Sequence, residues 1–212
     1  MSDVVVDGPE VERGAEVLTG EALAFLGELQ RLFGPRRDEL LAARQRRREE
    51  VSRTGRLDFL PETAEVREGD WRVAPTPPDL HDRRVEITGP TERKMTINAL
   101  NSGARVWLAD LEDANTPHWR NVVGGQLTLR DAVRGVLSFT SPEGKEYAVA
   151  DPATAPVVLP RPRGWHFDEA HLLRDGRPVV AALVDFGLHA FHNARELVDQ
   201  GRGPFYYLPK ME

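Results

Sequence analysis

Cysteine is absent from the sequence, and this absence excludes disulfide bonds, thiol catalysis and thiolate–metal sites together. Any metal ion would have to be bound through oxygen or imidazole. His189 and His192 are three apart on a predicted helix, and we expect them to pack or to face solvent rather than to bind a metal. An uninterrupted apolar run of about 18 residues, which a membrane-spanning helix requires, is also missing. The start, Met1-Ser2-Asp3, lacks the basic-then-apolar order of a signal peptide. We therefore expect a cytoplasmic protein with no membrane partner.

Nucleotide-binding motifs are missing as well. Neither G-x-x-x-x-G-K-[ST] nor G-x-G-x-x-G occurs, so a nucleotide-binding fold is unsupported. The net charge of −6 argues against nucleic acid as the main partner, because phosphate contacts need a surplus of lysine and arginine on one face. Residues 44–48 are rich in arginine, but acidic residues flank them on both sides. A solvated, salt-bridged helix face is the favoured interpretation.

The composition is that of a globular chain, with 40% hydrophobic and 29% charged residues, and its length suits one large domain with an appendage. Residues 1–18 show no sustained hydrophobic period, and we expect a mobile end there. From Thr19, a possible N-cap, apolar residues recur at three- and four-residue steps and predict a helix that ends at Gly34. Pro35 suits the first turn of a second helix that ends before Gly55. The two helices would form an antiparallel hairpin.

Residues 56–80 contain several prolines and few periodic apolar positions, which predicts a segment that wraps over a surface and closes a region spanning residues 19–80. Residues 81–212 then alternate between short extended and helical stretches. We predict strands at residues 84–88, 106–110, 157–161 and 204–208, helices at residues 93–102, 129–137 and 181–198, and a hairpin around Pro142-Glu143-Gly144.

This alternation predicts an α/β fold. Strands that alternate with helices indicate parallel pairing with right-handed crossovers, in either a doubly wound sheet or a barrel. A complete eightfold barrel needs about 250 residues, and the stretch after Leu80 has room for about half of one. Either the sheet is open, or the chain is a piece of a longer protein.

Three carboxylates gather at the end of the predicted strand at residues 106–110. Asp110 and Glu112 alternate onto one face, and Asp113 follows in a loop. Because the carboxyl ends of parallel strands carry the ligand in α/β folds, a metal ion, a charged substrate or a cationic side chain is expected here. The alternative is that these carboxylates cap the next helix or pair with nearby arginines. Spacing alone leaves both interpretations open.

Two arginines lie at the end of the predicted strand at residues 157–161. Arg161 and Arg163 are two residues apart and can project on the same side, with prolines stiffening the backbone between them. A rigid arginine at a strand end suits bidentate binding of a carboxylate or stabilisation of an oxyanion. The alternative is that the arginines neutralise the three carboxylates across the sheet, and the two arginines could differ in role.

Four long stretches resemble consecutive signature segments of the malate synthase A family. They are FLPETAEVREGDWRVAPTPPDLHDRRVEITGP, RKMTINALNSGARVWLADLEDANTPHW, LPRPRGWHFDEAHLL and FGLHAFHNARELVDQGRGPFYYLPKME. The resemblance covers most of the chain after Leu57, in order and without large gaps. It implies a (β/α)8 TIM barrel preceded by an N-terminal helical clasp and followed by a C-terminal helical domain. Residues 81–212 would then be the first strands and helices of a barrel that is incomplete in this chain.

The resemblance also implies an activity, which is the magnesium-dependent Claisen-type condensation of acetyl-CoA with glyoxylate, followed by thioester hydrolysis to malate and CoA in the glyoxylate cycle. The RPRGW motif places the family's catalytic arginine at Arg161, with Arg163 as the second candidate. Asp110, Glu112 and Asp113, in the motif ADLEDAN, would lie near the metal and its waters.

The resemblance places the magnesium ligands and the catalytic base in later strands and loops, so we expect the isolated chain to hold no metal ligand and to be inactive. Two alternatives remain open. One is a related lyase that acts on malyl or citramalyl thioesters, and the other is a non-catalytic protein that acts only by association.

Overall fold

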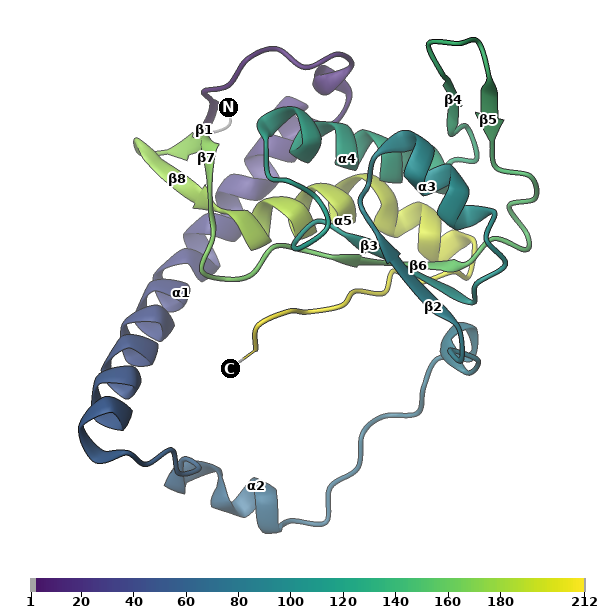
Figure 1. Ribbon diagram of the computed structural model, residues 1–212. Coiled ribbons are helices and arrows are strands. Elements are labelled where there is room, and N and C mark those ends of the chain that lie inside the picture. Colours follow the sequence, from purple (N-terminus) through teal and green to yellow (C-terminus); the bar gives the residue numbers. More distant parts are fainter. Residues whose placement is uncertain (1–2, 212) are drawn as a thin grey trace.

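A parallel three-stranded sheet lies at the centre of the computed structural model, which describes residues 3–211 (Figure 1). In spatial order its strands are β2 (Glu86–Gly89), β3 (Val106–Asp110) and β6 (Val157–Arg161). Four of the five residues of β3 are buried, as expected of a central strand whose two faces are both covered. The three strands were predicted, two of them at these bounds, and the α/β class is confirmed.

Three helices cover one side of this sheet, and the C-terminal coil runs along the other side (Figure 1). They are α3 (Arg93–Leu100), α4 (Trp119–Val133) and α5 (Ala181–Asp199). A core of apolar side chains from α3, β3 and α4 lies between the sheet and the helices. The predicted start of α4 was ten residues late, because its N-cap His118 makes no side-chain cap bond and two glycines near its start lower helix propensity.

Helix α1 (Gly20–Thr54) is one helix of 35 residues with Pro35 inside it, so the predicted helical hairpin is wrong. Thr19 is the N-cap as predicted, and its hydroxyl accepts a hydrogen bond of 3.2 Å from the N–H of Ala22. Every buried residue of α1 precedes Pro35. The hydrogen bond that proline cannot donate is therefore lost where the helix leaves the core, and proline is tolerated there.

The segment after α1 has no buried residue between residues 56 and 79. It contains only the short elements η2 (Pro61–Thr63), α2 (Ala64–Glu68) and η3 (Pro78–Leu80). Together with the second half of α1 it extends away from the sheet before the chain returns to β2 (Figure 1).

The described part of the N-terminal stretch is folded onto the rest of the protein, so the predicted mobile end at residues 1–18 is wrong for residues 3–18. Strand β1 (Val4–Val6) pairs antiparallel with β7 (Asp168–Arg174), which pairs with β8 (Arg177–Val180). Val4 and Val17 are buried with α1, α4 and α5 in a second core. These two valines pack against elements far along the chain, so their spacing shows no helical or strand period that the sequence alone could reveal.

The β7–β8 hairpin was missed, although its turn has a recognisable sequence. Asp175 and Gly176 both adopt left-handed φ angles, of 51° and 72°, as the two-residue turn of a hairpin requires, and Asp-Gly is a preferred pair there. The predicted hairpin around residues 142–144 is confirmed as β4 (Ser138–Thr140) and β5 (Glu146–Ala148).

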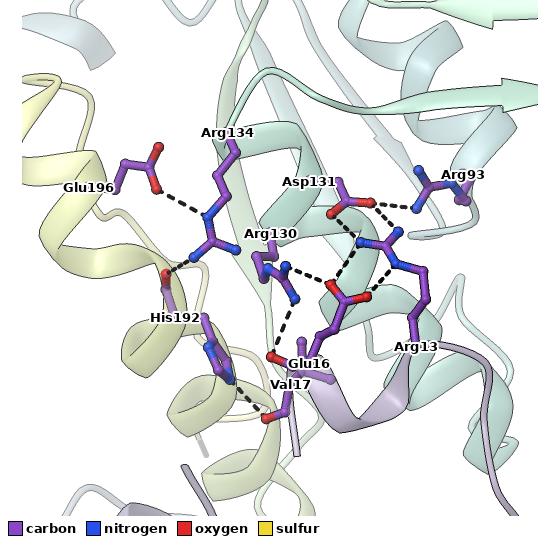
Figure 2. Close-up of polar contacts among 9 residues, drawn as sticks. All are labelled: Arg13, Glu16, Val17, Arg93, Arg130, Asp131, Arg134, His192 and Glu196. Carbon is purple, nitrogen blue, oxygen red and sulfur yellow. Dashed lines mark hydrogen bonds and ion pairs between the residues drawn. The ribbon is translucent and has the colours of Figure 1, made fainter. Parts of the chain in front are cut away.

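Charged side chains attach the N-terminal stretch to the helices (Figure 2). Buried Asp131 of α4 accepts hydrogen bonds of 2.8 Å from both Arg13 and Arg93, and Glu16 pairs with Arg130 at 2.7 Å. Burial opposes ionisation of Asp131, but the two arginines hold the pKa of its carboxyl below the ordinary value. This network joins η1 (Gly14–Glu16) to both α3 and α4.

The predicted strand at residues 204–208 does not form. Within the described chain this segment makes one backbone hydrogen bond to the sheet, from the N–H of Tyr207 to the carbonyl of Pro160 at 3.0 Å. The segment follows the edge of β6 without a ladder of bonds, and a strand needs such a ladder. No helix among residues 3–211 has the length and hydropathy to cross a membrane.

Two glycine-to-alanine changes should have opposite effects on stability, because one glycine lies in the contact between α1 and α5 and the other faces open space. A Cβ on Gly187 would lie 2.5 Å from Cδ2 of Leu26 and 2.9 Å from Cδ1 of Leu29, whereas a Cβ on Gly124 of α4 would meet nothing within 4 Å. Gly124→Ala should stabilise the fold by about 0.5–1 kcal/mol. Gly187→Ala should destabilise it by about 1 kcal/mol, because overpacking outweighs the same helix-propensity gain. Thermal unfolding of both variants measures the difference, and equal stability would contradict this packing.

Candidate active site

The parallel register of β3 and β6 places Asp110 directly opposite Arg161 at the carboxyl ends of the two strands. The side chains form a two-pronged ion pair, with Arg161 Nε 2.8 Å from Asp110 Oδ1 and Nη2 2.6 Å from Oδ2. In α/β folds this edge of the sheet is where ligands bind. The predicted carboxylates and the predicted arginine therefore meet in one place.

Both carboxylate oxygens of Asp110 accept hydrogen bonds from other groups of the protein. Besides Arg161, it accepts bonds from the backbone N–H groups of Glu112 (2.9 Å), Asp113 (3.1 Å) and Ala114 (2.9 Å). Burial opposes its ionisation, but Arg161 and these N–H groups hold the pKa of its carboxyl below the ordinary value. Asp110 thus folds the loop after β3 around a permanent negative charge.

One guanidinium nitrogen of Arg161 makes no hydrogen bond to the described part of the chain. Nε and Nη2 bind Asp110, and Nη2 also donates to Asp113 at 2.9 Å. Within residues 3–211, Nη1 donates no hydrogen bond, and it lies 3.9 Å from Glu112 Oε2. The hydrogen bonds to Asp110 raise the pKa of the guanidinium, so it stays a cation. Its orientation is fixed, and one pair of N–H donors is left for a ligand.

Glu112 is the second carboxylate at this edge, and its side chain is 1% exposed. Lys210, in the C-terminal coil, lies with Nζ 3.2 Å from Oε1 and 3.3 Å from Oε2 of Glu112. The sequence interpretation did not identify Lys210. The sequence offered only an indirect signal for Lys210. A predicted parallel strand at residues 204–208 would bring the residues after it to the carboxyl ends of the strands.

Arg163 has different partners, and the expectation that it shares a side with Arg161 is wrong. It is 4% exposed, and its side chain donates to both oxygens of Asp185, at 2.9 and 2.8 Å, and to Glu169 at 2.8 Å. Strand β6 ends at Arg161, so strand alternation does not extend to position 163. The sequence interpretation missed Glu169 and Asp185, which belong to β7 and α5.

Burial opposes the charged forms of both Arg163 and Glu169. The pKa of Arg163 is nonetheless raised by Asp185 and Glu169, and the pKa of Glu169 is lowered by Arg163 and His171. All three nitrogens of the guanidinium donate to these two carboxylates. Arg163 is therefore occupied in joining β6 to α5 and β7.

The two histidines of α5 both make contacts inside the protein. Burial lowers the pKa of His189 to about 4, and its Nδ1 lies 2.8 Å from the hydroxyl of Tyr206. Nε2 of His192 lies 2.8 Å from the carbonyl oxygen of Val17. Both side chains pack, which is one of the two roles expected of them.

Sequence comparisons identify the family. The malate synthase N-terminal domain family matches residues 2–65, and the malate synthase TIM barrel domain family matches residues 157–212. Malate synthase of Streptomyces clavuligerus is 62% identical over 211 residues, with 98% of this chain and 39% of the relative covered. The chain belongs to the malate synthase family.

Further malate synthases are similar over nearly the whole chain. The relative from Myxococcus xanthus is 58% identical, with 99% of this chain and 38% of the relative covered, and malate synthase A of Escherichia coli is 45% identical, with 96% and 38% covered. The resemblance found in the sequence is thereby confirmed. The chain spans about two fifths of the length of these malate synthases, and its open sheet with β6 at one edge is part of a TIM barrel.

The buried Arg163 cluster predicts a large stability loss on removal of its cation. Arg163→Met leaves Asp185 and Glu169 buried without the arginine that they share, which should cost about 3–5 kcal/mol of unfolding free energy. Arg36→Met is the matched control, because within residues 3–211 Arg36 forms only an exposed ion pair with Glu39, and the change should alter stability by less than about 0.5 kcal/mol. Urea unfolding at pH 7 measures both.

The same cluster predicts the pH dependence of this loss. The folded pKa of Glu169 lies below its ordinary value of 4.5, so its contribution is present above that pH and is lost as the pH falls through the folded pKa. The gap between wild type and Arg163→Met should therefore narrow as the pH falls below 4.5 and through the folded pKa of Glu169. A gap that stays constant or widens on acidification would contradict the assignment of the charges.

Proposed function

We propose that the chain provides the arginine side of a malate synthase active site, which condenses acetyl-CoA with glyoxylate and hydrolyses the thioester to give malate and CoA in the glyoxylate cycle. Family membership supports this proposal. The observation that carries it is the geometry of Arg161, which is held by Asp110 and Asp113 at the carboxyl end of β6 while Nη1 donates no hydrogen bond within the described chain.

The chemistry requires a fixed cation at this place. A base removes a proton from the acetyl methyl group, and the resulting enolate carbon forms a bond to the aldehyde carbon of glyoxylate. Negative charge develops first on the thioester oxygen and then on the former aldehyde oxygen, and water later displaces CoA. A guanidinium that is already oriented stabilises these charges without reorganisation. Arg161 meets this requirement, and Arg163 does not, because its donors are occupied.

Magnesium belongs to the proposal, and the described residues fit only its outer coordination. Among residues 3–211 no group of three or more histidine or acidic side chains is arranged to hold a metal ion. Glu112 and Asp113 lie at the correct edge with carboxylate oxygens that suit the water molecules that magnesium usually retains. Magnesium, when bound, would polarise the glyoxylate carbonyl. We assign its direct ligands and the base to the part of the relatives that this chain does not span.

The test is a chimera in which this chain replaces the matching 39% of the Streptomyces clavuligerus relative. The chimera should release CoA from acetyl-CoA when glyoxylate and magnesium are added, and the isolated chain should not. Arg161→Met in the chimera should lower kcat/KM by about 10²–10³, the usual cost of losing one group that stabilises an oxyanion. Arg36→Met, on the exposed part of α1, serves as the control and should stay within about twofold of the parent.

Three outcomes would contradict the proposal. Full activity of the chimera with Arg161→Met would remove the arginine from the mechanism. Robust turnover by the isolated chain would show that the base and the metal ligands lie within it. Cleavage of malyl-CoA by the chimera without synthesis from glyoxylate would favour the related lyase.

A further inference from the structure

Glu112 lies between two cations that come from different parts of the fold. Lys210 Nζ is 3.2 Å from its carboxylate on one side, and Arg161 Nη1 is 3.9 Å from it on the other. Lys210 is within hydrogen-bonding distance, whereas Arg161 Nη1 is not. The carboxylate is therefore bound by the lysine and leaves the arginine nitrogen open.

The other two carboxylates at this edge do not compete for the same nitrogen. Asp110 is bonded to Nε and Nη2 of Arg161 and to three backbone N–H groups. Asp113 is bonded to Nη2 and is largely exposed. Glu112 is buried, and Lys210 is the one donor to its carboxylate within the described residues. A buried carboxylate that loses its only hydrogen-bonded cation is strongly destabilised, and Arg161, whose Nη1 lies 3.9 Å away, is the cation that remains beside it.

The C-terminal coil holds Lys210 in a defined place. Its backbone adopts a left-handed φ of 51°, which few residues other than glycine adopt. The N–H of Tyr207 attaches the coil to Pro160 of β6, and the Lys210 side chain packs so closely on Gly164 that a Cβ there would lie 3.3 Å from Lys210 Cγ. The ammonium group therefore reaches Glu112 from a fixed side.

We propose that Lys210 is a positioning residue that acts through Glu112. By binding the Glu112 carboxylate, it prevents this group from closing onto Arg161 Nη1, so that Nη1 stays available for the oxyanion of the reaction. The role of Nη1 in turnover rests on the proposed function. The competition of Lys210 and Arg161 for Glu112 does not, since it concerns only groups of this chain.

The first experiment measures the competition without any substrate. Crystal structures of the chain and of its Lys210→Met variant should show the distance from Glu112 to Arg161 Nη1 shortening from 3.9 Å to about 2.9 Å, the length of a charged hydrogen bond. In Lys210→Arg the wider distance should be kept. An unchanged distance in Lys210→Met, with the carboxylate hydrated or turned away, would overturn the proposal. Lys145→Met, on the exposed β4–β5 turn, is the control for loss of a lysine.

The second experiment uses a double-mutant cycle in the chimera. Lys210→Met should lower kcat/KM about 10²-fold, because the arginine donors become occupied. In the Glu112→Gln background the same lysine change should cost less than about threefold, since a neutral amide does not form the competing ion pair. Equal losses in both backgrounds would overturn the proposal and indicate that Lys210 contacts substrate directly.

The two experiments separate this inference from the proposed function. If the parent chimera forms no malate but the distance shortens in Lys210→Met, the proposed function fails and the positioning role of Lys210 stands. If the parent chimera is active and the distance does not change, the positioning role fails alone. An inactive Glu112→Gln chimera leaves the decision to the crystal structures.

Discussion

The ion pair between Asp110 and Arg161 is the interaction on which the candidate site depends. It spans the ends of two adjacent parallel strands, where the register sets the two residues opposite each other. A buried carboxylate is costly unless it is fully bonded, and Asp110 meets this requirement by also binding three N–H groups of the following loop. One pair thus fixes the arginine, folds the loop and turns Glu112 inward.

Two arginines in one short motif have acquired different roles because the strand ends between them. Arg161 is still in β6, and its side chain reaches the neighbouring strand. Arg163 lies beyond the strand end, where its N–H and its guanidinium bind Asp185 of α5. The buried cluster around Arg163 joins β6 to α5 and β7, while Nη1 of Arg161 donates no hydrogen bond within the described residues. Both residues are arginines of the same RPR motif, and they differ in the carboxylates that their guanidinium groups bind.

Local patterns were sufficient for the elements that pack within one region of the chain. The run VWLAD is apolar enough to be a central strand in any neighbourhood, and α5 has a clear helical period. Patterns failed where a distant contact or its absence decided the outcome. The region around Gly34 and Pro35 has local helix-stop and helix-start signals, but α1 continues through it because proline falls outside the core. The stretch PFYYL has strand propensity, but it makes one backbone hydrogen bond to β6 within the described chain and not the ladder of bonds that a strand needs.

The sequence by itself determined the family and the α/β class, and it placed Asp110 and Arg161 at the ends of two predicted strands, because these follow from long local strings and from strands that are close in the chain. Only the tertiary structure decided that Val4 to Val6 pair with β7, that each guanidinium nitrogen of Arg163 donates to a buried carboxylate and that Lys210 binds Glu112. These contacts join residues that are up to about 170 positions apart, or depend on where a strand ends. Their stabilisation arises from burial and charge pairing that form only when the whole chain has folded, so no local pattern encodes them.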